Sequence, residues 1–240
     1  MTESVKVQRV LAVGAHPDDC EMLCGGTLAL YAAKSVAVTI CAVARGDKGS
    51  REIAPGELAT QRHAEATRAA GVFAAQFLSL DAADGDVGST PELRLKLIET
   101  IRRVRPDLIL THWPDDYHAD HRATGELVID CSWFAASPGH RTQSPALNDP
   151  VPVFHMDTLT GLSFEPTEYV NISGVWAKKE EMLRCHASQL GPAAQHGEGD
   201  LVVLARDLAR FRGRQCGVEF AEGFRPCLKW KRVRSYRMLP

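Results

Sequence analysis

Residues 9–21, "RVLAVGAHPDDCE", run from a buried-strand pattern directly into a turn that carries histidine and aspartate. The segment 9–15 is a short, continuous apolar run ending in small residues, which is typical of a strand covered on both faces of a sheet. His16, Pro17, Asp18 and Asp19 follow it at once. In an open α/β sheet the carboxyl ends of the strands form the ligand crevice, so these side chains are expected to face one.

Strand and helix patterns alternate around this segment. Further strands are predicted at 36–44, 75–80, 106–113 and 153–159. Helices are predicted at 25–34, 57–72, 90–107, 175–189 and 201–213. Because this alternation requires crossover connections, it predicts a three-layer α/β fold with a doubly wound, mainly parallel, Rossmann-like sheet. We expect residues 1–240 to form a single domain.

Composition narrows the class of partner. Hydrophobic residues make up 45% of the chain, charged residues 24%, and the formal net charge is -2, which is ordinary globular composition. Without an overall basic charge, a small-molecule partner is expected rather than nucleic acid. No apolar stretch reaches the roughly 20 residues of a membrane span and no signal-type run precedes the first strand, so a soluble, cytoplasmic protein is expected.

The seven cysteines are an odd number and contain no CxxC pair, which favours reduced, buried thiols over a disulfide framework or a four-cysteine zinc site. The basic C-terminal segment 229–240, "KWKRVRSYRMLP", is expected to form a solvated strand or tail. The sequence leaves self-association open.

A second histidine and aspartate cluster follows the strand expected at 106–113. The segment 111–122, "THWPDDYHADHR", supplies Asp115, Asp116, His118, Asp120 and His121. Both clusters fall on the same edge of the predicted sheet. Neutral imidazoles and carboxylates are the ligands of a catalytic divalent metal ion, which takes three protein ligands and leaves a position for water.

The "HPDD" doublet has two readings. One aspartate can bind the metal while its neighbour accepts a proton from the bound water, which implies metal-assisted hydrolysis. Alternatively, the segment is a turn, because proline and aspartate are favoured there. Two such clusters on one sheet edge favour a shared metal site. Spacing alone does not decide which aspartate is the ligand.

Two motifs resemble a known family, the LmbE-like or PIG-L-type zinc-dependent N-acetylglucosaminyl deacetylases. "AHPDDCE" at 15–21 matches that family's AHPDDxE segment, and "HADHR" at 118–122 resembles its HPDH segment, with Ala119 where proline is usual. Weaker resemblance extends to "GGT" at 25–27, "RGDKGS" at 45–50 and "CHASQ" at 185–189. Ala119 alters the stiffness of the turn but removes no ligand.

The resemblance implies a role for each matching residue. The implied zinc ligands are His16, Asp19 and His121. Asp18 would be the general base, His118 would stabilise the oxyanion or donate a proton, and Asp120 would hold His118. The implied activity is zinc-dependent removal of an N-acetyl group from an N-acetylglucosamine-type sugar or glycoside.

Three further residues are expected to contact the amino-sugar substrate. They are Asp47 in the loop 45–51, Arg62 on the following helix, and Asp84 in "LDAADGD". Each also has an ordinary structural reading, as a solvated loop, a surface pair or a turn. Trp113 and Tyr117 flank the second cluster and are candidates for stacking on a sugar ring, but packing in the core or at its rim is favoured for each. The proline-rich loop 137–152 is expected to form a wall or lid.

Three other functions compete with this one. The chain could cleave another acyl amine or a thiol conjugate. It could be a non-catalytic metal- or sugar-binding module, but such a module is expected to lack Asp18 or a ligand, and all are present. A nucleotide-binding Rossmann protein is disfavoured, because it needs GxGxxG where this chain places carboxylates that would repel a pyrophosphate.

Overall fold

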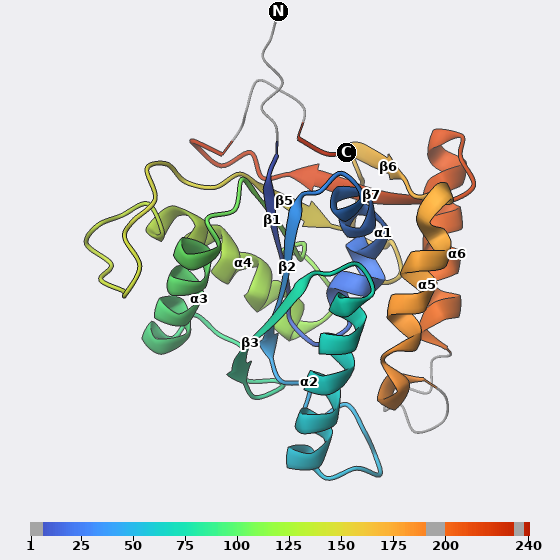
Figure 1. Cartoon of the computed structure of the whole chain (residues 1–240), viewed down its shortest axis with the longest axis horizontal. Helices are drawn as coiled ribbons and strands as arrows, with labels where there is room; N and C mark the ends of the chain where they lie inside the picture. The colour runs from blue at the N-terminus through green and yellow to red at the C-terminus, as the bar shows by residue number, and fades with distance from the viewer. Residues whose placement is uncertain (1–6, 191–199, 233–237) are drawn as a thin grey trace, which may run out of the picture.

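The computed structural model describes residues 7–190, 200–232 and 238–240 (Figure 1). Its centre is one seven-stranded sheet with the order β3-β2-β1-β4-β5-β7-β6. The strands are β1 (Arg9–Gly14), β2 (Ala37–Ala44), β3 (Gln76–Ala82), β4 (Leu108–Thr111), β5 (Val153–Met156), β6 (Glu168–Asn171) and β7 (Ala221–Pro226). Strands β1 to β5 pair in parallel, whereas β7 pairs antiparallel with both β5 and β6. The predicted doubly wound, mainly parallel sheet is confirmed.

Helices cover both faces of the sheet and complete three layers (Figure 1). They are α1 (Asp19–Ala33), α2 (Pro55–Gly71), α3 (Pro91–Val104), α4 (Ala119–Phe134), α5 (Trp176–Arg184) and α6 (Leu201–Cys216), with short 3-10 turns at Ser173–Val175 and Ala187–Gln189. Helices α3 and α4 cover one face; α1, α2, α5 and α6 cover the other. Alternate residues of β1 feed the two cores, Val10 and Ala12 on the α1 side, Leu11 and Val13 on the α4 side.

The first helix begins earlier than its apolar pattern suggests. The alanine-rich pattern predicts a start near residue 25, but α1 begins at Asp19, immediately after the "HPD" turn. Asp19 and Glu21 therefore occupy the first turn, where acidic side chains interact favourably with the helix dipole. The early start fixes Asp19 at the carboxyl end of β1.

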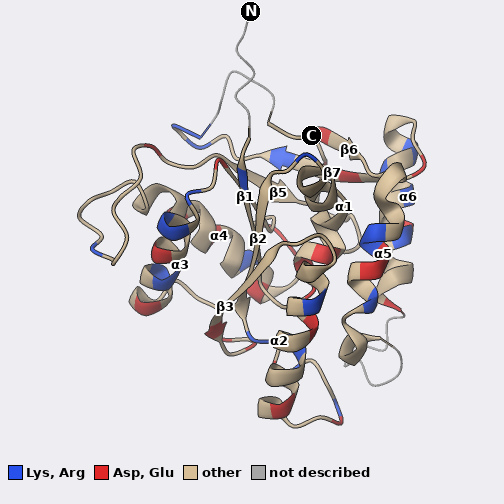
Figure 2. Ribbon diagram, in the orientation of Figure 1, with Lys and Arg blue, Asp and Glu red and all other residues tan. Residues whose placement is uncertain are grey.

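The end of the chain matches the expected solvated strand or tail only in part, because Lys229, Trp230 and Lys231 are exposed whereas Arg232, Met238 and Leu239 are buried. The last strand among the described residues is β7, which precedes the basic segment, and residues 233–237 of that segment lie outside the described residues. Arg232 is buried, and its guanidinium donates to the Ser132 hydroxyl and the Ile129 carbonyl. In Figure 2, ribbon segments of Lys or Arg and of Asp or Glu are interspersed along α3 and α5.

Within the described ranges, no helix is both long enough and apolar enough to cross a membrane. All seven cysteines fall within those ranges and are free thiols.

Candidate active site

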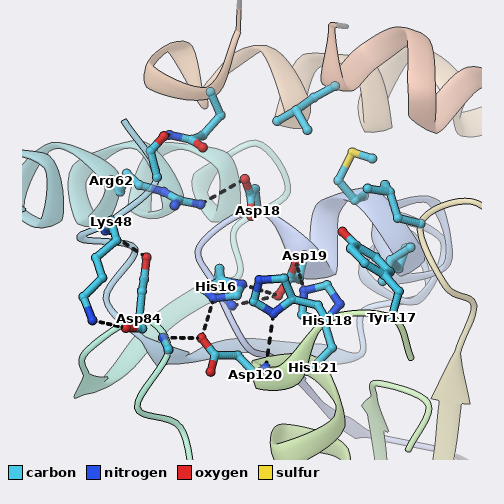
Figure 3. Close-up of a pocket in the computed structure, with 17 residues that line it drawn as sticks. His16, Asp18, Asp19, Lys48, Arg62, Asp84, Tyr117, His118, Asp120 and His121 are labelled. Atoms are coloured by element: carbon cyan, nitrogen blue, oxygen red, sulfur yellow. Dashed lines mark hydrogen bonds and ion pairs between the residues drawn. The ribbon is translucent and has the colours of Figure 1, made fainter. Parts of the chain in front are cut away.

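The two histidine and aspartate clusters meet at the carboxyl edges of β1 and β4. The connection from β1 runs to β2 on one side, and the connection from β4 runs to β5 on the other, so the crossover direction reverses between the two strands. Such a switch point leaves a crevice outside the sheet. Here it is a cavity of about 370 Å³, into which α1 and α4 direct their N-terminal ends (Figure 3).

The three predicted metal ligands converge in this cavity. His16 Nδ1 lies 3.6 Å from Asp19 Oδ2, and His121 Nε2 lies 3.4 Å from Asp19 Oδ1. The two oxygens of the Asp19 carboxylate thus face two different imidazoles. His16 leaves β1, Asp19 opens α1 and His121 lies in the first turn of α4, so the convergence depends on the β1/β4 pairing.

Two outer carboxylates fix how these imidazoles point. His16 Nε2 lies 3.0 Å from Asp120 Oδ2, and His121 Nδ1 lies 3.1 Å from Asp116 Oδ1. If each outer nitrogen donates its proton to the carboxylate, the inner nitrogen keeps a lone pair directed at Asp19. This carboxylate–histidine arrangement is the usual outer shell of a zinc site. The donor set therefore fits a zinc ion.

The expected contact between Asp120 and His118 is corrected by this geometry. The Asp120 carboxylate bonds to His16 and accepts from the Gly85 backbone N–H at 2.7 Å. Only the Asp120 backbone N–H reaches His118, donating to its Nδ1 at 3.1 Å. The reason is that His118 is the N-cap residue of α4, so its ring bonds the exposed end of its own helix.

His112 was missed by the sequence reasoning. It directly follows β4, is fully buried, and its Nε2 lies 3.0 Å from Asp19 Oδ2. Its ring stacks on His121 with the ring centroids 4.0 Å apart. Two overlapping sets of side chains could hold a metal ion, one formed by His16, His118 and His121, the other by Asp19, His112 and His121, so the predicted ligands His16, Asp19 and His121 are divided between two sets that share His121. Its position at the carboxyl end of a buried strand could have marked His112 as a member of the site.

The histidines and the aspartate of the cluster shift one another's pKa values, because their charges are opposite. Burial opposes the protonation of His16, but Asp120 and Asp19 outweigh it and raise the pKa to about 10. Burial likewise opposes the charge on His121, and Asp19 and Asp116 raise its pKa to about 9. Burial disfavours ionised Asp19, yet His121 and His112 hold the pKa of this carboxyl well below its usual value. A divalent cation binds such a cluster by displacing its protons.

Asp18 lies beside the predicted ligands without being one of them. Its carboxylate Oδ2 accepts from Arg62 at 3.0 Å and lines the cavity (Figure 3). Burial raises the pKa of Asp18 despite the nearby Arg62 guanidinium, which makes the carboxylate a stronger base. The backbone of Asp18 has φ 136°, a conformation that non-glycine residues rarely adopt and that is typical of functional turns.

His118 also reaches the cavity, as predicted. Burial lowers its pKa, and the neighbouring His121 and His16 lower it further, which favours the neutral ring. Since Nδ1 accepts the Asp120 N–H, the proton of the neutral ring belongs on Nε2. His118 can therefore offer an N–H donor to a bound molecule.

The three residues expected to contact substrate divide into two groups. Of the described residues, those lining the cavity include Arg62 and Asp84 but not Asp47. The Asp47 carboxylate is buried against Arg45 and the Asp84 backbone N–H. Asp84 in turn accepts from the backbone N–H groups of Gly46 and Lys48. Asp47 thus supports the loop that carries Lys48, and its expected contact with substrate stays a prediction.

The proline-rich loop 137–152 is not a wall of this cavity. None of its described residues lines the cavity, and it packs on α3 instead. The Arg102 guanidinium donates to the carbonyls of Ser137 and His140, and Glu99 accepts from Ser144. Arg102 and Glu99 of the amphipathic helix α3 therefore bind this loop.

A buried histidine and glutamate, His186 and Glu21, form a pair for which the sequence predicted no role. His186 is fully buried and its Nε2 lies 3.4 Å from Glu21 Oε1. Burial opposes the protonation of His186, but Glu21 and Asp18 raise its pKa. The "CHASQ" segment was thus a genuine signal, since Gln189 from the same segment lines the cavity.

Comparison with known proteins identifies relatives of this arrangement. The family model PIG-L, GlcNAc-PI de-N-acetylase, matches residues 11–132. Diacetylchitobiose deacetylase from Thermococcus kodakarensis is 31% identical over 232 residues, covering 91% of this chain and 83% of that protein. The structure of N,N'-diacetylchitobiose deacetylase from Pyrococcus horikoshii superposes with a TM-score of 0.82 and 25% identity, covering 92% of this chain and 84% of the other.

One relative has a different named activity. The 4-oxalmesaconate hydratase of Pseudomonas putida is 26% identical over 188 residues, covering 75% of this chain and 73% of that protein. The family match spans both motifs, and the diacetylchitobiose deacetylase aligns with nearly the whole chain. The chain therefore belongs to the PIG-L, or LmbE-like, family of deacetylases.

Proposed function

We propose that this protein is a zinc-dependent hydrolase that removes the N-acetyl group from an N-acetylglucosamine-type sugar or glycoside. One observation carries the proposal: two histidines, each oriented by an outer carboxylate, face the two oxygens of Asp19. The deacetylases of Thermococcus and Pyrococcus support it, because they align with 91% and 92% of this chain.

His16, Asp19 and His121 would hold the zinc ion. When bound, zinc supplies a water molecule whose pKa is about 7 and an electrophile that polarises the amide carbonyl. Asp116 and Asp120 keep the two imidazoles turned toward the ion.

Asp18 acts as the general base of the reaction. Its carboxylate accepts a proton from the attacking water, and burial favours this transfer by raising its pKa. Arg62, 3.0 Å away, holds the carboxylate in one orientation. The protonated Asp18 can then return the proton to the leaving amine. The acyl group leaves as a carboxylate and the sugar as a free amine.

His118 stabilises the oxygen that becomes negative during attack. The neutral ring offers its Nε2–H to the former carbonyl oxygen, and such donors act strongly in a site shielded from water. Arg62 and Asp84 line the side of the cavity where sugar hydroxyls would bind.

The test combines metal analysis with product detection. Purified protein is analysed for bound metal, depleted with a chelator and reloaded with zinc, then incubated with N-acetylglucosamine, diacetylchitobiose and N-acetylglucosaminyl-inositol. We expect equal amounts of acetate and primary amine, lost on chelation and restored by zinc. Zinc-loaded protein that releases no amine, or releases it equally after chelation, contradicts the proposal. Hydration of 4-oxalmesaconate without amine release would assign this chain to the chemistry of the Pseudomonas relative instead.

We also propose that the protein works in a reducing compartment and forms a single domain. A reducing compartment such as the cytoplasm suits a chain whose seven cysteines are free. A single domain suits a sheet that takes strands from both ends of the chain, from β1 at Arg9 to β7 at Ala221–Pro226. The expected partner is an amino-sugar, and a basic surface for nucleic acid is not expected at a net charge of -2.

A further inference from the structure

We propose that one side of the cavity is an acyl-binding wall, and that the enzyme hydrolyses N-acyl amino sugars with chains longer than acetyl more efficiently than the N-acetyl compound. This inference rests on the proposed function and concerns the substrate class of the same site. It comes from the unequal chemistry of the two sides of the cavity.

The side of the cavity next to β2 and β3 is polar. Its members come from the loops after these strands, from α2 and from the 3-10 turn Ala187–Gln189: Lys48, Gly49, Arg62, Asp84 and Gln189. The Gln189 amide donates to the Gly49 carbonyl at 3.5 Å, which ties that turn to the same side. Figure 3 shows Lys48, Arg62 and Asp84 together, away from Tyr117.

The other side of the cavity is apolar. Its members are Met22, Leu23, Tyr117, Leu159 and Leu201. Tyr117 follows β4 and Leu159 follows β5, and these strands lie on the opposite side of β1 from β2 and β3. The strand order therefore places Tyr117 and Leu159 on the opposite side of β1 from the polar wall, and Figure 3 shows the histidine cluster between Tyr117 and the pair Lys48 and Asp84.

The geometry of an amide then assigns each wall to one part of the substrate. The carbonyl must lie between Asp18 and His118, in the middle of the cavity. The groups attached to the carbon and to the nitrogen of a trans amide extend in opposite directions. A sugar ring with several hydroxyls suits the polar wall, where charged and amide side chains can bond to it. The acyl chain is left facing the apolar wall.

An acetyl group is small for this wall. Met22 and Leu23 are nearly fully buried, whereas Leu159 and Leu201 are half-buried and Tyr117 is 61% exposed, so part of the apolar surface remains open to solvent. A longer acyl chain would cover this surface. Each methylene moved from water onto it is worth about fourfold in kcat/KM, the equivalent of about 0.8 kcal/mol.

The experiment is a chain-length series on the zinc-loaded protein. N-acetyl-, N-butyryl-, N-hexanoyl- and N-octanoylglucosamine are compared by the rate of glucosamine release. We expect kcat/KM to rise at least about tenfold from acetyl to hexanoyl. A flat or falling series, with acetyl still hydrolysed, overturns this inference and leaves the deacetylase proposal intact. Silence across the whole series also overturns this inference, and amine release from diacetylchitobiose by the same preparation then leaves the deacetylase proposal intact.

Variants of one loop locate the effect. Leu159→Asn should lower the hexanoyl-to-acetyl ratio of kcat/KM at least about fourfold, because it places an amide against the acyl chain. Leu162→Asn is the matched control, since Leu162 lies three residues further along, is 71% exposed and is not among the described lining residues. A ratio that falls equally in both variants, or in neither, contradicts the placement of the acyl chain on this wall.

Discussion

At the level of single residues, the site is built in two layers. His16 and His121 face Asp19 from the inside, and Asp120 and Asp116 hold their outer nitrogens. The outer layer matters because a free imidazole can rotate and present either nitrogen, whereas a bonded ring presents only one. Asp18 stands outside both layers and is bound by Arg62 instead.

Replacing Asp18 should therefore separate catalysis from metal binding. Asp18→Asn removes the base but keeps the size of the side chain, so turnover should fall about 10²- to 10⁴-fold. Zinc content should stay at the wild-type level, because Asp18 is not one of the proposed ligands. Steady-state rates with metal analysis of the same preparation measure both. Near-wild-type turnover at full zinc occupancy would remove Asp18 from the role of base.

Replacing an outer carboxylate should have the opposite effect. Asp116→Ala frees His121 Nδ1 and should weaken zinc binding about 10- to 100-fold, as measured by competition with a fluorescent chelator. The adjacent Asp115 is exposed, so Asp115→Ala is the control and should bind zinc like the wild type. Equal zinc affinities for the two variants would show that Asp116 does not orient the ligand.

At the level of secondary-structure elements, a buried ion pair fixes α1 against its neighbours. Lys179 on α5 and Glu222 on β7 lie 2.7 Å apart between Nζ and Oε1, and both side chains are almost fully buried. Lys179 also donates to the Met22 carbonyl, and Glu222 accepts from the backbone N–H groups of Gly26 and Thr27. The pair thus binds the helix whose first turn carries Asp19.

Breaking this pair should destabilise the whole protein. Lys179→Met leaves the Glu222 carboxylate buried without its counter-ion, which should lower the free energy of unfolding by about 3–5 kcal/mol in urea denaturation. The neighbouring Lys178 forms an exposed pair with Glu181, so Lys178→Met should cost less than about 1 kcal/mol. Similar losses in both variants would mean that burial of the Lys179 pair has no special effect.

The sequence predicts a strand or helix well where its residues share one environment, such as burial on both faces. Strands β1, β2 and β4 are buried on both faces and read as continuous apolar runs, and the sequence predicts them within a few residues. Strand β7 carries Glu222 and Arg225, whose partners are distant in the chain, and it showed no pattern. The start of α1 was misplaced because its first turn is acidic and its apolar body begins later.

At the level of the whole molecule, the sheet order decides how much of the site the sequence can reveal. Parallel alternation was enough to place both clusters on one edge, because the carboxyl ends of parallel strands share that edge. The Asp120 carboxylate bonds to His16, which lies 104 positions away in the sequence, and not to His118. No local sequence pattern predicts so distant a contact. The same applies to the apolar wall, whose residues come from separate loops and helices.

The pH dependence of global stability should carry the signature of His155, a buried histidine of β5. Burial, assisted by Lys229 and Arg225, lowers its pKa to about 4 although its Nδ1 bonds the His112 carbonyl at 2.9 Å. Between pH 4 and the ordinary value of 6.5, the unfolded chain binds a proton at this position and the native protein does not. The contribution of neutral His155 is therefore complete above pH 6.5 and lost as the pH falls toward 4, by about 3 kcal/mol in total.

His155→Asn keeps a side-chain N–H donor but does not titrate, so in metal-free protein its unfolding free energy should fall less steeply than that of the wild type over this range. The exposed His63 provides the control, since His63→Asn should follow the wild-type curve. Parallel curves for His155→Asn and the wild type between pH 4 and 6.5 would contradict a neutral, buried His155.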